Sequence, residues 1–193
     1  PLGVAFPAVV RQGIVGSAAN IDESWIDVDA DALFSAASRC DVHMLNDADA
    51  AGIAEMQFGV GALSDGSPFP GTVMMLTFGT GIGSGLFVDG VLVPNTELGH
   101  LELDGNDAEL KASAKARERD DLSWKDWASR VEYYLSHVEA LFSPDLFIVG
   151  GGASKKPEKW LPHIGIATPV LPAKMANNSG IVGAALAAQD WRA

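Results

Sequence analysis

The sequence "LNDADAAGIAEM", residues 45–56, decides how the fold of this chain is interpreted. It follows the apolar run at residues 42–45, which predicts a buried strand, and it continues in an Ala- and Gly-rich pattern that predicts a helix over residues 48–58. A helix with side chains this small is expected to pack closely on a neighbouring element. The Asn and two Asp at the junction have two interpretations: they cap the helix, or one of them handles a proton.

The rest of the chain alternates strands with helices, which predicts an α/β fold. Strands are expected at residues 3–7, 13–16, 42–45, 72–78, 85–88, 91–93 and 145–149, and helices at residues 29–37, 48–58, 107–120, 123–142 and 179–190. Asp89 and Gly90 form a two-residue turn signal between two of these strands, and Ser123 with Asp126 is a capping-box variant. The Gly- and Pro-rich residues 59–71 are expected to be a loop between lobes.

Length and composition limit the class of protein. A chain of 193 residues with 48% hydrophobic content can bury the core of one domain or two small lobes. No run approaches the ~20 apolar residues of a membrane span, and residues 1–4 lack the basic region of a secretory signal. The single Cys40 cannot form an internal disulfide, which fits a reducing compartment. We therefore expect a cytoplasmic protein without membrane association.

The charge is distributed unevenly. A net charge of −12 argues against nucleic acid as a partner, because an acidic protein repels polyanions. Residues 1–110 hold 2 basic and 16 acidic side chains, whereas residues 111–193 hold 11 basic and 9 acidic ones. Nine basic residues lie between positions 111 and 159. They are either ordinary solvated helix faces or, if they converge in space, a site for an extended anion.

Two glycine-rich segments follow predicted strands. Residues 78–85 place a Gly at every second position from 79 to 85, and residues 150–152 are three consecutive Gly. Glycine lets backbone N–H groups approach phosphate oxygens, and ligands of open α/β sheets bind beyond the carboxyl ends of strands. A tight hairpin without a ligand is the alternative for the first segment. Two such segments in one chain favour a phosphorylated ligand.

A polar motif follows the predicted hairpin. Glu97 and His100 are three residues apart with Gly99 between them, so both side chains can turn toward one ligand. A carboxylate and an imidazole together suit neighbouring hydroxyl groups. A zinc ion at His100 would need partners that no Cys or His cluster supplies.

These motifs resemble, in order and spacing, the ROK sugar kinases. The resemblance is carried by residues 46–55, 78–83, 97–100 and 148–152, and it covers nearly the whole chain. Residues 115–124 and 144–152 are most similar to the branch of that family that phosphorylates glucose from inorganic polyphosphate. The resemblance implies an α/β, actin-like (ribonuclease-H-like) two-lobe fold. Residues 1–70 would be the remainder of the small lobe, joined by the helix over 179–193, and residues 71–178 would be the large lobe.

The resemblance also implies roles for individual residues. Asp47 would be the general base that accepts the proton of the sugar 6-hydroxyl. Asp49 is interpreted as a residue that complements the helix dipole. The sugar-binding residues would be Asn20, Asn46, Asp47, Glu97, His100 and Glu109. The transferring phosphate would be held by Gly79, Thr80, Gly81 and Gly83, and the nucleotide or polyphosphate by Gly150, Gly151, Gly152, Lys155 and Lys156.

Two departures from the family pattern shape the expectations. ROK kinases commonly carry a three-Cys zinc cluster after the Glu-x-Gly-His motif, but residues 101–120 contain no Cys, so no metal is expected at His100. The family's first phosphate loop, an Asp-x-Gly-Gly-Thr motif, is absent. The N-terminal part of the small lobe is therefore expected to be missing from this chain.

Three functions follow from these observations. The first is a kinase that transfers a phosphoryl group from polyphosphate, and from ATP, with Mg²⁺, to the 6-hydroxyl of glucose, with mannose as a further candidate acceptor. The second is an ATP-only ROK hexose kinase. The third is a non-catalytic sugar-sensing regulator or binding module, which the family also contains. Analogy with the family predicts a homodimer.

Overall fold

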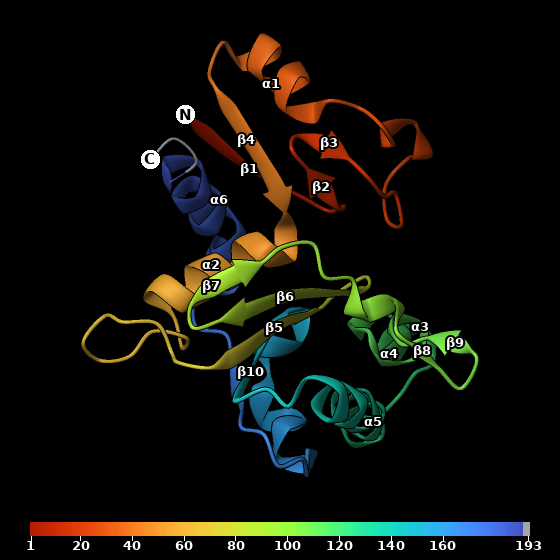
Figure 1. Cartoon of the computed structure of the whole chain (residues 1–193). Coiled ribbons are helices and arrows are strands. Elements are labelled where there is room, and N and C mark those ends of the chain that lie inside the picture. Colours follow the sequence, from red (N-terminus) through yellow and green to blue (C-terminus); the bar gives the residue numbers. More distant parts are fainter. Residues whose placement is uncertain (191–193) are drawn as a thin grey trace.

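The computed structural model describes residues 1–190, in which two groups of strands lie on either side of a pair of helices (Figure 1). In the upper group, β1 (Leu2–Phe6) and β4 (Val42–Asn46) pair in parallel. Strands β2 (Val10–Arg11) and β3 (Ile14–Val15) form a short antiparallel pair, and helix α1 (Ala30–Ser38) contacts β4. This arrangement confirms the strand predicted at residues 42–45.

The lower group is a five-stranded mixed sheet. Its strands, in spatial order, are β11 (Val170–Pro172), β10 (Leu146–Gly151), β5 (Thr72–Phe78), β6 (Ile82–Val88) and β7 (Val91–Val93). The first three run parallel, whereas β5, β6 and β7 are antiparallel neighbours. Because β5 and β10 are parallel and adjacent, the glycine-rich segments that follow them come together at one edge of the sheet.

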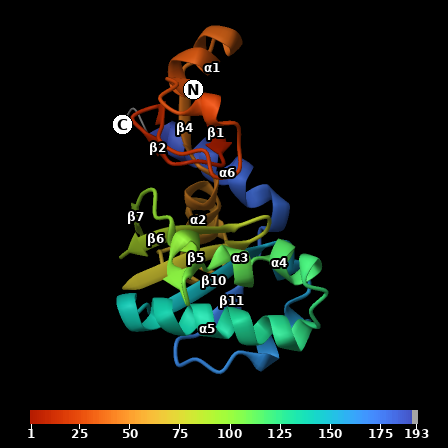
Figure 2. The same cartoon turned by 90° about the vertical axis from the view of Figure 1, so that its right-hand side faces the viewer.

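One long helix covers the face of this sheet away from the upper group (Figure 2). Helix α5 (Trp124–Phe142) begins as predicted, because the Ser123 hydroxyl accepts a hydrogen bond from the Asp126 amide at 3.1 Å. Its buried residues are Trp127, Ala128, Val131, Tyr134, Leu135 and Val138. Leu141 was also expected on the buried face, but it lies at the edge of the apolar stripe and is 64% exposed.

Helix α2 (Asp47–Phe58) lies between the sheet and helix α6 (Ser179–Asp190). A Cβ atom added at Gly52 would meet the Phe87 ring, and one added at Gly183 would overlap the Ala50 carbonyl group. The small residues of α2 therefore serve close packing on two sides at once. This confirms the expectation that the helix packs tightly on its neighbours.

The loop within the glycine-rich residues 78–85 is shorter than predicted. Strand β6 already begins at Ile82, so the turn consists of residues 79–81. Gly83 and Gly85 lie within the strand on the face toward α2, where added Cβ atoms would meet Ala48. Their alternation therefore reflects the two-residue period of a strand pressed against a helix.

The single helix predicted over residues 107–120 is wrong. The segment contains strand β9 (Asn106–Asp107), which pairs with β8 (Glu102–Leu103), and then the short helices α3 (Glu109–Ala112) and α4 (Ala114–Arg119). Ser113 adopts an extended conformation, and its hydroxyl accepts a hydrogen bond from the Ala116 amide. It ends one helix and caps the next, a role for which Ser is favoured.

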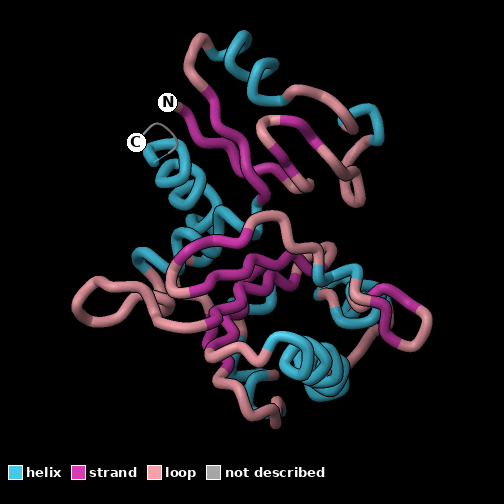
Figure 3. The backbone as a smooth tube through the Cα atoms, viewed as in Figure 1, coloured by secondary structure: helices cyan, strands magenta, loops and turns pink. Residues whose placement is uncertain are grey.

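The remaining elements are single turns and connections (Figure 3). Within residues 1–190, six 3₁₀ helices occur: η1 (Glu23–Trp25), η2 (Leu98–His100), η3 (Gly152–Lys155), η4 (Pro157–Lys159), η5 (Leu161–His163) and η6 (Ala176–Asn178). Helix α6 packs on β1 and α2.

The division into lobes at residue 70 stays a prediction. No helix within residues 1–190 is long and apolar enough to cross a membrane.

We expect Gly183→Ala to destabilise the protein by about 1–3 kcal/mol, because overpacking a tight contact forces the backbones apart. The added methyl group would overlap the Ala50 carbonyl and separate α6 from α2. Denaturant unfolding measures the change. Gly180→Ala in the same helix is the control, because its Cβ would make an ordinary 3.8 Å contact with Ala5. Equal stability of the two variants would contradict the packing argument.

Candidate active site

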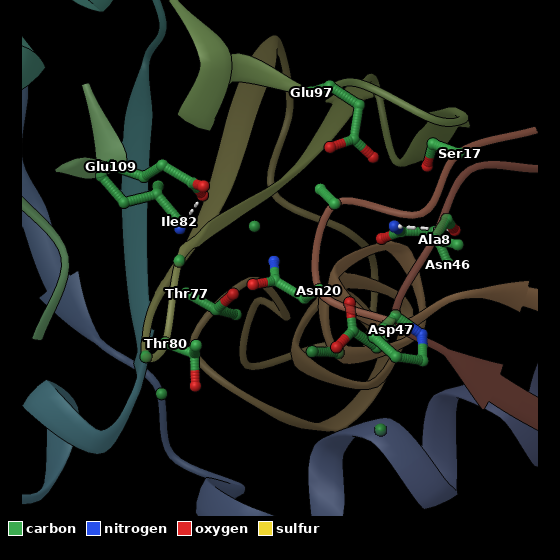
Figure 4. Close-up of a pocket in the computed structure, with 18 of the residues that line it drawn as sticks. Ala8, Ser17, Asn20, Asn46, Asp47, Thr77, Thr80, Ile82, Glu97 and Glu109 are labelled. Atoms are coloured by element: carbon green, nitrogen blue, oxygen red, sulfur yellow. Dashed lines mark hydrogen bonds between the residues drawn. The ribbon is translucent and has the colours of Figure 1, made fainter. Parts of the chain in front are cut away.

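A pocket of about 540 Å³ opens where the start of α2, the turn after β5 and the start of α6 meet (Figure 4). Its polar lining residues include Ser17, Asn20, Asn46, Asp47, Thr77, Thr80, Glu97, His100, Glu109 and Ser179. Its backbone lining includes Gly79, Gly81, Gly83, Gly151 and Gly180. The pocket thus joins a carboxylate-rich wall to a glycine-rich wall.

Asn46, and not Asp47, is the N-cap residue of helix α2. The Asn46 Oδ1 atom accepts hydrogen bonds from the amides of Ala48 at 2.8 Å and Asp49 at 3.1 Å. Its Nδ2 atom donates to the Ala8 carbonyl at 3.2 Å. The Asp47 side chain, one residue later, projects into the pocket (Figure 4). Both interpretations of the junction therefore apply, each to a different residue. The Asn46 side chain caps the helix, and the Asp47 carboxylate is available to accept a proton.

The surroundings of Asp47 favour proton transfer. Partial desolvation in the pocket raises the pKa of its carboxyl group, although hydrogen bonds from the Ala48 amide and its own amide oppose the shift. A carboxylate with a raised pKa is a better proton acceptor than one in bulk water. Asp47 can therefore act as a general base on a hydroxyl group bound in the pocket.

Glu97, which precedes the 3₁₀ helix η2, and His100, the last residue of η2, line the same pocket. Their Oε2 and Nε2 atoms are 3.9 Å apart, and His100 Nδ1 is 2.8 Å from Asp107 Oδ2. This contact with Asp107 raises the pKa of His100, whereas burial raises the pKa of Glu97. Sequence reasoning missed Asp107, which orients the imidazole ring from the neighbouring hairpin.

Glu109 and Asn20 also reach the pocket. The Glu109 carboxylate accepts a hydrogen bond from the Ile82 amide at 3.1 Å (Figure 4). A Cβ atom at Gly81 would collide with this carboxylate and lie 3.4 Å from the Asn20 amide nitrogen. Glycine at position 81 therefore makes room for two of the predicted sugar-binding side chains.

The predicted phosphate-binding residues divide between the pocket and its surroundings. Gly79, exposed Thr80, Gly81 and Gly83 line it, as does Gly151. In contrast, Gly150 is buried inside β10 and Gly152 lies in η3, so neither lines the pocket. Lys155 and Lys156 are exposed just beyond Gly151 and do not line it either.

The basic residues at positions 111–159 converge only in part. The Arg117 guanidinium lies 4.0 Å from the centre of the Trp124 ring, and Lys159 Nζ lies 6.0 Å from it. Arg119 and Arg130 both bind Asp120 at 2.7 Å instead. Arg117 and Lys159 therefore form a small cationic group around one aromatic ring.

Several pocket residues were not predicted from sequence. Thr77 lies near the end of β5, Ser17 follows β3, and Ser179 and Gly180 begin α6. The strand ending at residue 78 gave a signal for Thr77, because a side chain next to a glycine-rich exit lies near any ligand there. No local pattern indicated Ser17 or Ser179, because folding brings them from distant segments.

Asp49 lies in the first turn of α2, where a residue that complements the helix dipole is expected. Its side chain is also buried, with 1% of its surface exposed. Its Oδ2 atom accepts a hydrogen bond from the Asn95 amide at 2.8 Å. Burial raises its pKa to about 7, and the nearby Glu97 and Asp47 carboxylates add to the shift. Asp49 is thus a buried link between α2 and the loop that carries Glu97.

The chain is similar in sequence to known sugar kinases. The model of the ROK family matches residues 1–113. The polyphosphate glucokinase of Mycobacterium tuberculosis is 48% identical over 97% of this chain, which covers 69% of that protein.

Solved structures agree in fold. The inorganic polyphosphate/ATP-glucomannokinase of Arthrobacter sp. strain KM is 55% identical and superposes with a TM-score of 0.91, covering 96% of this chain and 72% of the other. A ROK family glucokinase of Streptomyces griseus, solved with glucose and AMPPNP, has a TM-score of 0.78 over 97% of this chain and 81% of its own. At 23% identity, that second similarity concerns the fold alone.

We expect the stability gained by Asp49→Asn to grow with pH. Unfolded Asp49 ionises near pH 3.8, whereas in the folded protein its pKa is about 7. Between these values the folded state retains a proton that the unfolded state has lost, so wild-type stability falls relative to the variant as pH rises, and the difference levels off above about pH 7. Unfolding midpoints measured across this range test the prediction. A difference that does not change with pH would contradict it.

Proposed function

Because the chain belongs to the ROK family and has the family's actin-like two-lobe fold, we propose that it transfers a phosphoryl group from inorganic polyphosphate, and from ATP, to the 6-hydroxyl of glucose. The names of its relatives support this donor and acceptor: one is a polyphosphate glucokinase and another a polyphosphate/ATP-glucomannokinase. The second name also supports mannose as an acceptor.

One observation supports the proposal above all. Asp47, a carboxylate with a raised pKa, faces the same pocket as the glycine turn at residues 79–81. Phosphoryl transfer needs a positioned acceptor hydroxyl, a group that takes its proton, and donors that neutralise charge on the moving phosphoryl group. The acidic and glycine-rich walls supply the second and third of these.

The proposed reaction runs as follows. The 6-hydroxyl oxygen attacks the terminal phosphorus, its O–H proton passes to the Asp47 carboxylate, and the bond to the leaving phosphate oxygen breaks. Glu97, His100, Asn20, Asn46 and Glu109 would hold the other sugar hydroxyls. Carboxylates suit this task because they only accept hydrogen bonds, and every sugar hydroxyl can donate one. Gly79, Thr80, Gly81 and Gly83 would hold the transferring phosphate.

The donor would extend from the glycine wall. Gly151 lies on that wall, and the exposed Lys155 and Lys156 follow it in sequence. The two lysines would bind a chain of phosphates that leaves the pocket. Mg²⁺ would bind chiefly to donor phosphates and shield their charge. The oxygen side chains of Asp47, Thr77 and Thr80 suit such a hard cation. No zinc is proposed.

Two alternatives would use the same fold. An ATP-only hexose kinase would use the same pocket without the surface lysines, and a donor comparison separates it from the leading proposal. A sugar-sensing regulator would bind glucose without turnover, and one solved relative in fold is a ROK transcriptional regulator. Cytoplasmic location and a homodimer remain proposals by analogy with the family.

Asp47→Asn tests the central step. We expect turnover to fall at least about 10³-fold, because the amide cannot accept the hydroxyl proton, while glucose binding changes little. Coupled phosphorylation assays with polyphosphate and with ATP measure turnover, and calorimetry measures glucose binding. Asp65→Asn, at an exposed turn, is the control. Substantial residual turnover would place the base elsewhere.

The double variant Lys155→Glu/Lys156→Glu tests the donor path. We expect the KM for long polyphosphate to rise about tenfold, roughly 1.4 kcal/mol, and the KM for ATP to rise less, because a longer anion meets more of the reversed charge. Arg11→Glu/Arg39→Glu makes the same net charge change at two other exposed positions. Equal effects on both donors would remove the two lysines from the polyphosphate path.

A further inference from the structure

Asn95 joins three segments that are far apart in sequence. Its Oδ1 atom accepts a hydrogen bond from the Val10 amide, and its Nδ2 atom donates to the Val10 carbonyl, both at 2.9 Å. Its own amide donates to Asp49 Oδ2 at 2.8 Å. The side chain thus pairs with Val10 as a strand residue would. Asn95 has φ +61°, a left-handed conformation that Asn tolerates better than most residues.

The Val10 end of this contact belongs to the pocket wall. Val10 follows Pro7 and Ala8, which both line the pocket. The Ala8 carbonyl is bound by Asn46, and the Val9 amide donates to the Ser17 hydroxyl at 2.9 Å. The segment over residues 7–10 is therefore fixed by side chains, and Asn95 is the one that reaches it from beyond β7.

The other end belongs to the loop that carries Glu97. Thr96 and Ser84 exchange hydrogen bonds, and the Leu98 amide donates to the Ser84 hydroxyl at 3.0 Å. The residues on both sides of Glu97 are thus held, whereas its own carboxylate forms no capping bond within η2. The position of the Glu97 carboxylate depends on how its neighbours are held.

Asp49 connects this loop to the candidate base. It lies two residues after Asp47 in the first turn of α2, and it is buried. Its Oδ2 atom binds Asn95, whereas its Oδ1 atom is buried without a hydrogen-bond partner. Neither Asp49 nor Asn95 lines the pocket. Both can therefore act on a ligand only through the residues they hold.

We propose that Asp49, Asn95 and the Val10 backbone form a clamp that sets Glu97 at a fixed distance from Asp47 and holds the wall at residues 7–10 against the bound sugar. The inference rests on the proposed function, because it assigns positioning residues to the same sugar site. In this clamp Asn95 is the central member, since it makes all three hydrogen bonds.

Asn95→Ala in the intact gene product tests the clamp. The variant loses both bonds to Val10, so we expect the KM for glucose to rise at least tenfold, kcat to change less than threefold, and the KM for the phosphoryl donor to stay within twofold. Calorimetric titration with glucose alone should show the same weakening. Asn106→Ala is the matched control, because the Asn106 side chain binds only the Asp104 carbonyl of its own turn.

Variants of Asp49 provide a second test. Asp49→Asn keeps an oxygen that can accept from the Asn95 amide, so its KM for glucose should stay within about threefold of wild type. Asp49→Ala lacks that oxygen and should resemble Asn95→Ala. The double variant Asp49→Ala/Asn95→Ala should be no worse than about twofold beyond either single change, because both break one unit.

The outcomes separate the clamp from the proposed function. Glucose phosphorylation absent from the wild type would reject the proposed function. An active wild type whose Asn95→Ala variant keeps its KM for glucose would reject the clamp. Equal losses in kcat and in both KM values, with a lowered unfolding midpoint, would indicate a merely structural role and also reject it. If Asn95→Ala does not fold, the contrast between Asp49→Asn and Asp49→Ala decides the question.

Discussion

The structure depends on the close approach of helix α2 to the elements on either side of it. Gly52 lies against the Phe87 ring and Ala50 against Gly183, so larger side chains at these positions would push the helix away. Because β-sheet and helix backbones are stiff, this approach fixes the height of the first turn of α2 above the sheet. Asp47 is the first residue of that turn. The packing of small residues thus determines where the candidate base stands.

The same constraint explains why the acidic and glycine-rich walls meet. Gly83 allows the first turn of α2 to rest on β6, and β6 begins immediately after the turn at residues 79–81. In the parallel pair beside it, Gly151 is level with Phe78, so both glycine exits face the same space. The pocket therefore lies where the carboxyl ends of two adjacent parallel strands open toward a helix N-terminus, a favourable place for an anion.

Local patterns predicted strands β4, β5, β6, β7 and β10 and the helix after residue 47, because those features repeat within a few positions. They did not predict the short strands β2, β8, β9 and β11. Asn20 and Glu109 were predicted as pocket residues by the family resemblance and not by a local pattern. Local patterns failed where a polar side chain can bind either its own helix or a residue far away in the sequence. Ser113 interrupts an apparently continuous helix by capping its second half, and Asp49 binds Asn95, which lies 46 positions away. Gly85 of β6 looked like part of a ligand loop but faces a helix, whereas Gly83 faces the helix and also lines the pocket. A sequence pattern cannot distinguish these uses without the tertiary contacts.

The proposed reaction brings an anionic donor to a pocket whose proposed sugar-binding residues are rich in carboxylates. Burial raises the pKa values of Asp47, Asp49 and Glu97. The Asp47 carboxylate adds to the pKa shifts of Asp49 and Glu97, and Glu97 adds to that of Asp49. Hydroxyl groups of a bound sugar would replace lost water by donating to these oxygens. The phosphates would meet backbone N–H groups at the glycine-rich wall and, outside the pocket, the exposed Lys155 and Lys156. In the proposed reaction, one pocket would therefore bind a neutral polyol and a polyanion side by side, and Asp47 would lie close to their reacting atoms.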